Sequence, residues 1–155
     1  MNTRSLRLVA ASLLLSLAGA VGAADVITGK ADDKLAPARA RVAEKNWSAA
    51  LAELKKVNDP GSADWNNLMG YSLRKADAVN ILDAEKFYNE ALRIEPKHRG
   101  ALEYSGELYL MTGKLDMAEQ RLAALDKACF LPCEEYSDLK SAVARYKAAG
   151  NKYVP

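Results

Sequence analysis

Apolar and small side chains recur along this chain at a fixed interval of 34 residues. The recurring positions form four columns of equivalent residues. Within each copy of the repeat, members of three of these columns stand at positions i, i+4 and i+7, which is the spacing of one face of an α-helix. A fixed interval of this length is typical of helical repeat proteins, so the pattern predicts three equivalent helices. The columns are Trp47, Ile81 and Leu115; Ala50, Ala84 and Ala118; Leu54, Tyr88 and Leu122; and Val57, Ala91 and Leu125.

A further helix is expected before each of these three. In the third copy Leu102, Gly106 and Tyr109 share one face of a helix predicted over residues 99–112. Gly113 is placed to end that helix in a left-handed C-cap. Small residues are expected where the two helices of a pair approach closely, namely at Gly70, Ala84, Gly106 and Ala118.

The first two copies depart from this pattern. The apolar face of a helix predicted over residues 63–75 consists of Trp65, Met69, Gly70 and Leu73. The turn after it is about two residues longer than in the third copy and lacks the glycine. In the first copy a helix over residues 33–45 fits poorly because Pro37 lies near its start. A degenerate first copy is what the exposed end of a repeat array requires.

A last helix is predicted over residues 134–149, after the third copy. Its apolar face consists of Tyr136, Leu139, Val143 and Tyr146. Glu134 and Glu135 fall in its first turn, where negative charge favours the helix dipole, and Gly150 ends it. We expect this helix to cap the apolar face of the last copy. No alternating run of apolar residues predicts a strand, so the expected fold class is all-α.

These positions resemble the tetratricopeptide repeat (TPR) pattern. The matching residues are Met69, Gly70, Leu73, Ala84, Tyr88, Ala91 and Pro96 in the second copy, and Gly106, Tyr109, Gly113, Ala118, Leu122 and Leu125 in the third. The stretch CFLPCEEY is also similar to a segment that follows the last repeat in a group of exported bacterial TPR proteins. The resemblance implies a TPR-like solenoid over residues 32–149, with a tail over 150–155. The expected repeats are about 31–62, 63–98 and 99–132.

The N-terminus has the layout of a secretory signal peptide. Arg4 and Arg7 precede an apolar run over residues 8–21, and a cut after Ala23 is expected. Residues 1–23 are therefore predicted to be a signal peptide and residues 24–31 a flexible mature N-terminus. This places the protein in the periplasm or outside the cell, with no stable membrane insertion after cleavage.

Removal of the signal peptide also changes the charge of the chain. Two basic and no acidic side chains lie in residues 1–23, which leaves twenty of each sign in the mature protein. A nucleic-acid-binding protein needs a basic face, so nucleic acid is not an expected partner. No cofactor motif is present, and no cofactor is expected.

A partner-binding groove is expected along the first helix of each repeat, as the TPR resemblance implies. Two glutamates there would repel a peptide carboxylate, so a polar or basic extended peptide is the better candidate. The alternative is an ordinary solvated helix face. Tyr71 is expected to face the groove, Tyr88 and Tyr109 to be core residues, and Tyr104 is ambiguous. The groove candidates are Asp64, Asn67, Tyr71, Arg74, Lys75, Glu103 and Glu107.

The single histidine, His98, has no catalytic partner that the sequence identifies, and no enzyme activity is expected. It belongs to a small basic cluster with Arg93, Lys97 and Arg99. This cluster is either a contact for an acidic partner or lipid headgroup, or simply solvated.

Cys129 and Cys133 are the only cysteines. A structural zinc site needs four ligands, and a thioredoxin-like centre has a shorter C-x-x-C spacing in an α/β fold, so both are less favoured than a structural bond. In an exported chain we expect a structural disulfide between the last repeat and the capping helix.

The sequence as a whole favours a non-catalytic adaptor or scaffold that binds a protein or peptide in the cell envelope. Three alternatives remain open: a thiol redox component that uses Cys129 and Cys133, a structural subunit of an envelope complex, and a regulatory subunit of an exported enzyme. The oligomeric state is also open.

Overall fold

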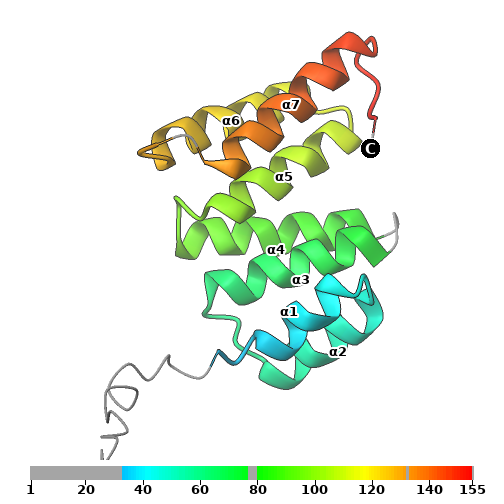
Figure 1. The fold of residues 1–155 in the computed structure, drawn as a ribbon, viewed down its shortest axis with the longest axis vertical. Coiled ribbons are helices and arrows are strands. Elements are labelled where there is room, and N and C mark those ends of the chain that lie inside the picture. The colour runs from blue at the N-terminus through cyan, green and yellow to red at the C-terminus, as the bar shows by residue number, and fades with distance from the viewer. Residues whose placement is uncertain (1–32, 77–79, 132, 155) are drawn as a thin grey trace, which may run out of the picture. The chain divides into compact units, whose positions relative to one another are not determined.

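The computed structural model describes residues 33–76, 80–131 and 133–154 (Figure 1). The predicted signal peptide and the predicted flexible segment 24–31 lie outside these residues. The described part contains α-helices and no strand, which confirms the all-α prediction. The helices are α1 (Ala36–Ala43), α2 (Trp47–Val57), α3 (Ala63–Ala76), α4 (Ile81–Ile94), α5 (Arg99–Met111), α6 (Leu115–Ala128) and α7 (Glu134–Ala148).

The helices form consecutive antiparallel pairs. Helix α1 packs on α2, α3 on α4 and α5 on α6, and each pair contacts the next (Figure 1). Helix α7 packs against both α5 and α6. The architecture is therefore a solenoid of three helix pairs closed by a capping helix, as predicted.

The second helix of each pair follows the 34-residue register. Helices α2, α4 and α6 begin at Trp47, Ile81 and Leu115, which are the members of one column. The alanine column lies at the centre of each pair, where Ala50, Ala84 and Ala118 are completely buried. The repeat in the sequence therefore reflects a repeat in the packing of these helices.

The first helices of the pairs are less regular. Helix α1 covers only Ala36–Ala43, a shorter span than predicted, and has proline in its first turn. Helices α3 and α5 each differ by one residue at the C-terminal end from the predicted spans. Gly113 follows α5 with φ +74°, and Gly150 follows α7 with φ +68°, so both predicted helix-ending glycines adopt the left-handed conformation.

Two glycines allow close helix contacts, but with different partners. A Cβ atom on Gly70 would lie 2.9 Å from the ring of Tyr88 and 3.1 Å from the carbonyl oxygen of Ala84, which confirms the close approach of α3 and α4. A Cβ atom on Gly106 would lie 2.5 Å from a methyl group of Leu139 on α7. Gly106 therefore makes room for the capping helix, a role that the sequence did not predict for this glycine.

The apolar core is divided into two clusters. The larger one runs from α3 to α7 and contains Tyr88 and Tyr109, which confirms their predicted core positions. The smaller one joins α1, α2 and α3 around Leu54 and Trp65. The indole Nε1 of Trp65 donates a hydrogen bond of 2.8 Å to the carbonyl oxygen of Leu54. The first helix pair therefore has its own small core, attached to the rest through α3 and through Phe87 of α4.

Candidate partner-binding face

The seven groove candidates all lie on α3 and α5, but at different depths. Asp64 and Lys75 are exposed, and Tyr71 and Glu107 are half-buried. Asn67, Arg74 and Glu103 are only 8%, 4% and 7% exposed. The last three therefore lie deeper than the outward positions that the sequence predicted. We call the surface formed by the seven residues, together with Glu135 and Asp138 of α7, the first-helix face.

Arg74 and Glu107 form an ion pair that connects α3 to α5. The guanidinium Nη2 donates to Oε2 of Glu107 over 2.6 Å. The guanidinium carbon also lies 5.6 Å from the ring centroids of both Tyr71 and Tyr104, a distance typical of cation–π contacts. Arg74 is thus a buried link between neighbouring repeats, and its charge is already partnered within the protein.

A row of aromatic rings crosses the first-helix face. The ring centroids of Trp47 and Tyr71 are 5.9 Å apart, and those of Tyr71 and Tyr104 are 4.6 Å apart. Tyr88 continues the row, with its ring centroid 6.5 Å from that of Tyr104. The ambiguity over Tyr104 is resolved, because it is half-buried beside Tyr71. Burial, reinforced by the charge of Glu103, raises the pKa of the Tyr104 phenol.

Glu103 is buried beside other carboxyl groups. It makes no hydrogen bond or ion pair with any residue that the structure describes. Burial, and then repulsion from Glu107, Asp138 and Glu135, raises the pKa of Glu103 to about 8. At neutral pH this side chain is therefore mostly protonated. From the sequence we expected two glutamates that repel a carboxylate. In the structure Glu107 is paired with Arg74, and the raised pKa of Glu103 favours its neutral form.

A cleft of about 340 Å³ lies where the first helices begin. We call it the joint cleft, because it lies at the joints between repeats. It takes residues from α1, α3, the α4–α5 connection, α5 and α7. Its lining residues are Arg39, Asp64, Asn67, Glu95, Lys97, His98, Arg99, Gly100 and Glu135.

His98 organises one wall of the joint cleft. Its Nδ1 accepts a hydrogen bond of 3.1 Å from the backbone N–H of Ala101, so His98 caps the N-terminus of α5. Its Nε2 lies 2.9 Å from Oδ1 of Asp64, and the tautomer protonated on Nε2 satisfies both contacts. Arg39 donates to the other oxygen of the same carboxylate over 3.1 Å. Through their shared contacts with Asp64, Arg39 and His98 therefore connect α1, α3 and the start of α5.

Asp64 is the partner of His98 that the sequence did not identify. Burial raises the pKa of this carboxyl, but His98 and Arg39 together outweigh burial, so the net pKa is lowered. One signal in the sequence pointed to the pair, because Asp64 and His98 are separated by 34 positions, the interval of the repeat. Residues one repeat apart lie beside each other where neighbouring repeats meet.

The basic cluster at the α4–α5 joint is largely neutralised by ion pairs. Arg93 pairs with Glu90 at 2.6 Å, and Arg99 lies 3.5 Å from Oε1 of Glu135 on α7. His98 is buried as a helix cap. Of the four residues of this cluster, Lys97 is therefore the one that is exposed and has no ion pair with a described residue. The joint is therefore a region of mixed charge.

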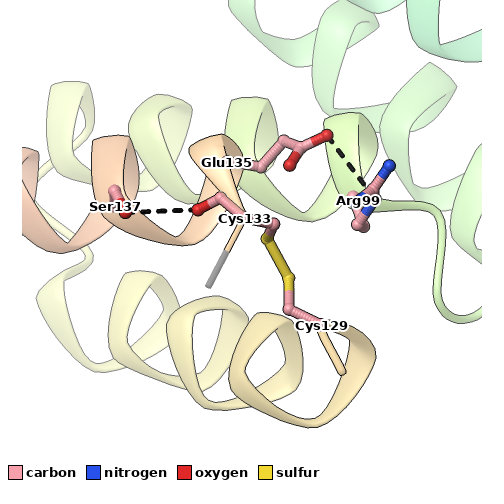
Figure 2. The surroundings of a disulfide bond; sticks show 5 residues. All are labelled: Arg99, Cys129, Cys133, Glu135 and Ser137. Carbon is pink, nitrogen blue, oxygen red and sulfur yellow. Dashed lines mark hydrogen bonds and ion pairs between the residues drawn. A yellow bond between two sulfur atoms is a disulfide. The ribbon is translucent and has the colours of Figure 1, made fainter. Parts of the chain in front are cut away.

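Cys129 and Cys133 form the predicted disulfide (Figure 2). Cys129 is the residue directly after α6, and Cys133 is the residue directly before α7. Figure 2 shows Glu135, the second residue of α7, pointing toward Arg99 of α5. Phe130 is fully exposed and Leu131 is also exposed. The disulfide thus closes the turn by which the last repeat leads into its cap.

Among the residues described, no helix has the length and apolar character needed to cross a membrane. Comparison with protein-family models finds none that matches the sequence, and comparison with curated proteins finds no match either.

Proposed function

We propose that the protein is an exported, non-catalytic adaptor of the TPR type that binds a protein or peptide segment along the first-helix face. The joint cleft is the observation that carries this proposal. It is a polar hollow to which α1, α3, α5 and α7 all contribute side chains. A hollow in which polar groups from several helices converge is a candidate binding site, because a few convergent polar groups fix the orientation of a ligand.

The aromatic row supports the same surface. Tyr71 and Tyr104 present large rings beside the exposed Lys75, and tyrosine is enriched at protein interfaces because it combines apolar area with a polar tip. The rings are held in position by the buried Arg74. A partner would therefore meet a preorganised surface, which lowers the entropic cost of binding.

The export part of the proposal rests on the N-terminal sequence. Arg4, Arg7 and the apolar run over residues 8–21 predict a signal peptide that is cleaved after Ala23. The disulfide supports this location, because such bonds persist in oxidising compartments.

A thiol redox role for Cys129 and Cys133 is a second candidate. The observation in its favour is a hollow of about 600 Å³ next to the disulfide, with the exposed Phe130 and Leu131 at its edge. Measurement of the reduction potential separates the two roles. A structural bond is expected to lie below about −300 mV, whereas a value near that of thiol exchange proteins would favour the redox role.

Site-specific photocrosslinking tests the adaptor proposal. A photoreactive residue replaces Lys75 on the first-helix face, or Lys86 on α4 as a matched exposed control. The full chain is expressed in an exporting bacterium, and crosslinked proteins are identified by mass spectrometry. We expect one defined partner from position 75 and none from position 86. A partner captured only from position 86 would support a structural subunit that uses its outer helices, and no partner at either position would overturn the adaptor role.

A further inference from the structure

Glu103 is the one carboxyl group of the first-helix face that is both buried and unpartnered among the described residues. Its side chain is on the inner face of α5, and the residue is only 7% exposed. Glu107, one turn further along, is paired with Arg74. No donor among the described residues reaches its carboxyl group, and the oxygens of that group are not sealed from solvent. A ligand that supplies a donor could therefore reach them from outside.

The charges around Glu103 are predominantly negative. Glu107, Asp138 and Glu135 all lie close enough to disfavour its ionised form. The nearby cations are already engaged, because Arg74 pairs with Glu107 and Arg99 pairs with Glu135. The site therefore lacks positive charge, and a positively charged group from outside would complement it.

Asn67 provides an independent indication of a missing donor. It belongs to α3 and is 8% exposed, and its Oδ1 atom is buried without a hydrogen-bond partner among the described residues. A Cβ atom on Gly100 would lie 3.0 Å from Nδ2 of Asn67, so this side chain packs directly against α5. Gly100 is one helical turn before Glu103, which places the two unpartnered acceptors along the same seam between α3 and α5.

We propose that Glu103 and Asn67 form an anchor for a lysine or arginine side chain of the partner, laid along the seam where α3 meets α5. This inference rests on the proposed adaptor function and specifies the chemistry of its ligand. An ammonium or guanidinium group offers several N–H donors, which match a carboxylate and an amide oxygen. The methylene groups of such a side chain would pack along the rings of Tyr71 and Tyr104.

Binding of a cation at this anchor is coupled to release of a proton. At neutral pH the Glu103 carboxyl is mostly protonated, since its pKa is raised to about 8. A cation favours the ionised form, so the affinity is expected to rise by up to about tenfold per pH unit below pH 8 and to level off above it.

Several other titratable groups lie around Glu103 on α5 and on the elements packed against it. On α5 itself they are Glu107 and Tyr104; on α3, Arg74 and Tyr71; and on α7, Glu135 and Asp138. From α4 and α6 the nearest groups are Tyr88, beside Tyr104, and Arg121, which contacts Tyr109. Tyr153 of the tail is near Glu107.

The test uses the isotopically labelled exported protein and a small cationic probe, N-acetyl-arginine-N-methylamide. Nuclear magnetic resonance follows the carboxyl carbon of Glu103 and the side-chain amide of Asn67 during titration at several pH values. The neutral control is the citrulline analogue, which has the same shape without the charge. We expect a saturable response to the arginine probe that strengthens with pH, and no saturable response to citrulline.

Two variants make the test specific. Glu103→Gln is expected to weaken binding of the arginine probe at pH 8 by at least about tenfold, which corresponds to the loss of a charged hydrogen bond. Glu90→Gln, at the exposed Glu90–Arg93 pair on α4, is the matched control and should bind as the parent protein does. Equal binding by Glu103→Gln, an equal response to citrulline, or the same saturable response to calcium chloride would each overturn the anchor.

Failure of the anchor and failure of the adaptor role give different results. A partner crosslinked at position 75 without any saturable arginine response overturns the anchor and leaves the adaptor role standing. A specific arginine response without a crosslinked partner supports the anchor as a binding site and overturns the adaptor role.

Discussion

Arg74 and Glu107 are separated by 33 positions, yet Nη2 of one lies 2.6 Å from Oε2 of the other. The pair belongs to successive repeats and crosses the first-helix face, with the guanidinium beside the rings of Tyr71 and Tyr104. The ion pair therefore holds the two tyrosine rings in place and also sets the spacing between α3 and α5. Residues at the centre of a binding face thus also hold neighbouring repeats in register.

Glu107→Gln should be strongly destabilising, because it leaves the charge of the buried Arg74 without an ionised partner. We expect a loss of about 3 kcal/mol in the free energy of unfolding, measured by urea denaturation. Glu90→Gln, which breaks the exposed pair with Arg93, is the control and should change stability little, because solvent screens such a surface pair. Similar losses in the two variants would show that the Arg74–Glu107 pair is no more important than a surface pair.

Glu103→Gln should change how stability depends on pH. The folded protein holds a proton on Glu103 up to about pH 8, whereas the unfolded chain releases it near the ordinary glutamate value of 4.5. The folded state therefore becomes less favourable as pH rises between these values, by up to about 1.4 kcal/mol per pH unit, and the penalty is constant above pH 8.

The variant lacks this titration, so its advantage over the parent protein should be smallest near pH 5 and largest above pH 8. Chemical denaturation at a series of pH values measures the difference. Parallel stability curves for the two proteins would contradict the burial of an unpartnered carboxyl at position 103.

Gly106→Ala should push the capping helix away from α5. The added methyl group would lie 2.5 Å from a side-chain carbon of Leu139, which is completely buried and has no free space to occupy. A loss of about 1 to 3 kcal/mol is expected, as for other overpacked cores. Gly61→Ala is the control, since its nearest neighbour atom would be 3.9 Å away. Thermal denaturation of both variants should separate them clearly.

His98→Ala should weaken the N-terminus of α5. It removes the acceptor for the N–H of Ala101 and the contact with Asp64, for an expected loss of about 1 kcal/mol. His98→Asn keeps a side-chain acceptor at the cap and should recover most of the loss. If the asparagine variant is as unstable as the alanine variant, the contact with Asp64 matters more than the cap.

Cys133→Ser should lower stability by about 2 kcal/mol, the chain entropy of so small a closed loop. Reduction of the parent protein should produce the same loss, and reduction of the variant should produce none. Binding of the arginine probe at Glu103 is expected to persist in the variant. Loss of binding with unchanged stability would mean that the disulfide belongs to the binding site and does not serve as a clip.

The sequence predicted the solenoid because the repeat is a local property. The face of each second helix depends only on spacing along the chain, so Ala50, Ala84 and Ala118 could be assigned to the core directly. The disulfide could be predicted for a similar reason, since Cys129 and Cys133 stand at the ends of two consecutive helices.

The depth of the groove candidates could not be read in the same way. Whether Arg74, Asn67 and Glu103 are exposed depends on how closely α3, α5 and α7 approach, and side chains from other helices decide this. The contact of Gly106 with the cap was missed for the same reason, because its neighbour Leu139 is contributed by α7. Helix periodicity identifies which positions share a face, but contacts between repeats determine how deeply each position is buried.

The two ends of the solenoid are secured by different means. At one end the disulfide ties α6 to α7 covalently, while at the other α1 and α2 are held by non-covalent contacts alone, which are their small core with α3, the Arg39–Asp64 ion pair and the Trp65–Leu54 hydrogen bond. In a linear array each unit depends on its neighbours alone, so opening begins at the end that is least secured. The molecule therefore has a preferred direction of unravelling, from α1 toward the cap. A ligand bound between α3 and α5 would retain its site after the first helix pair had opened.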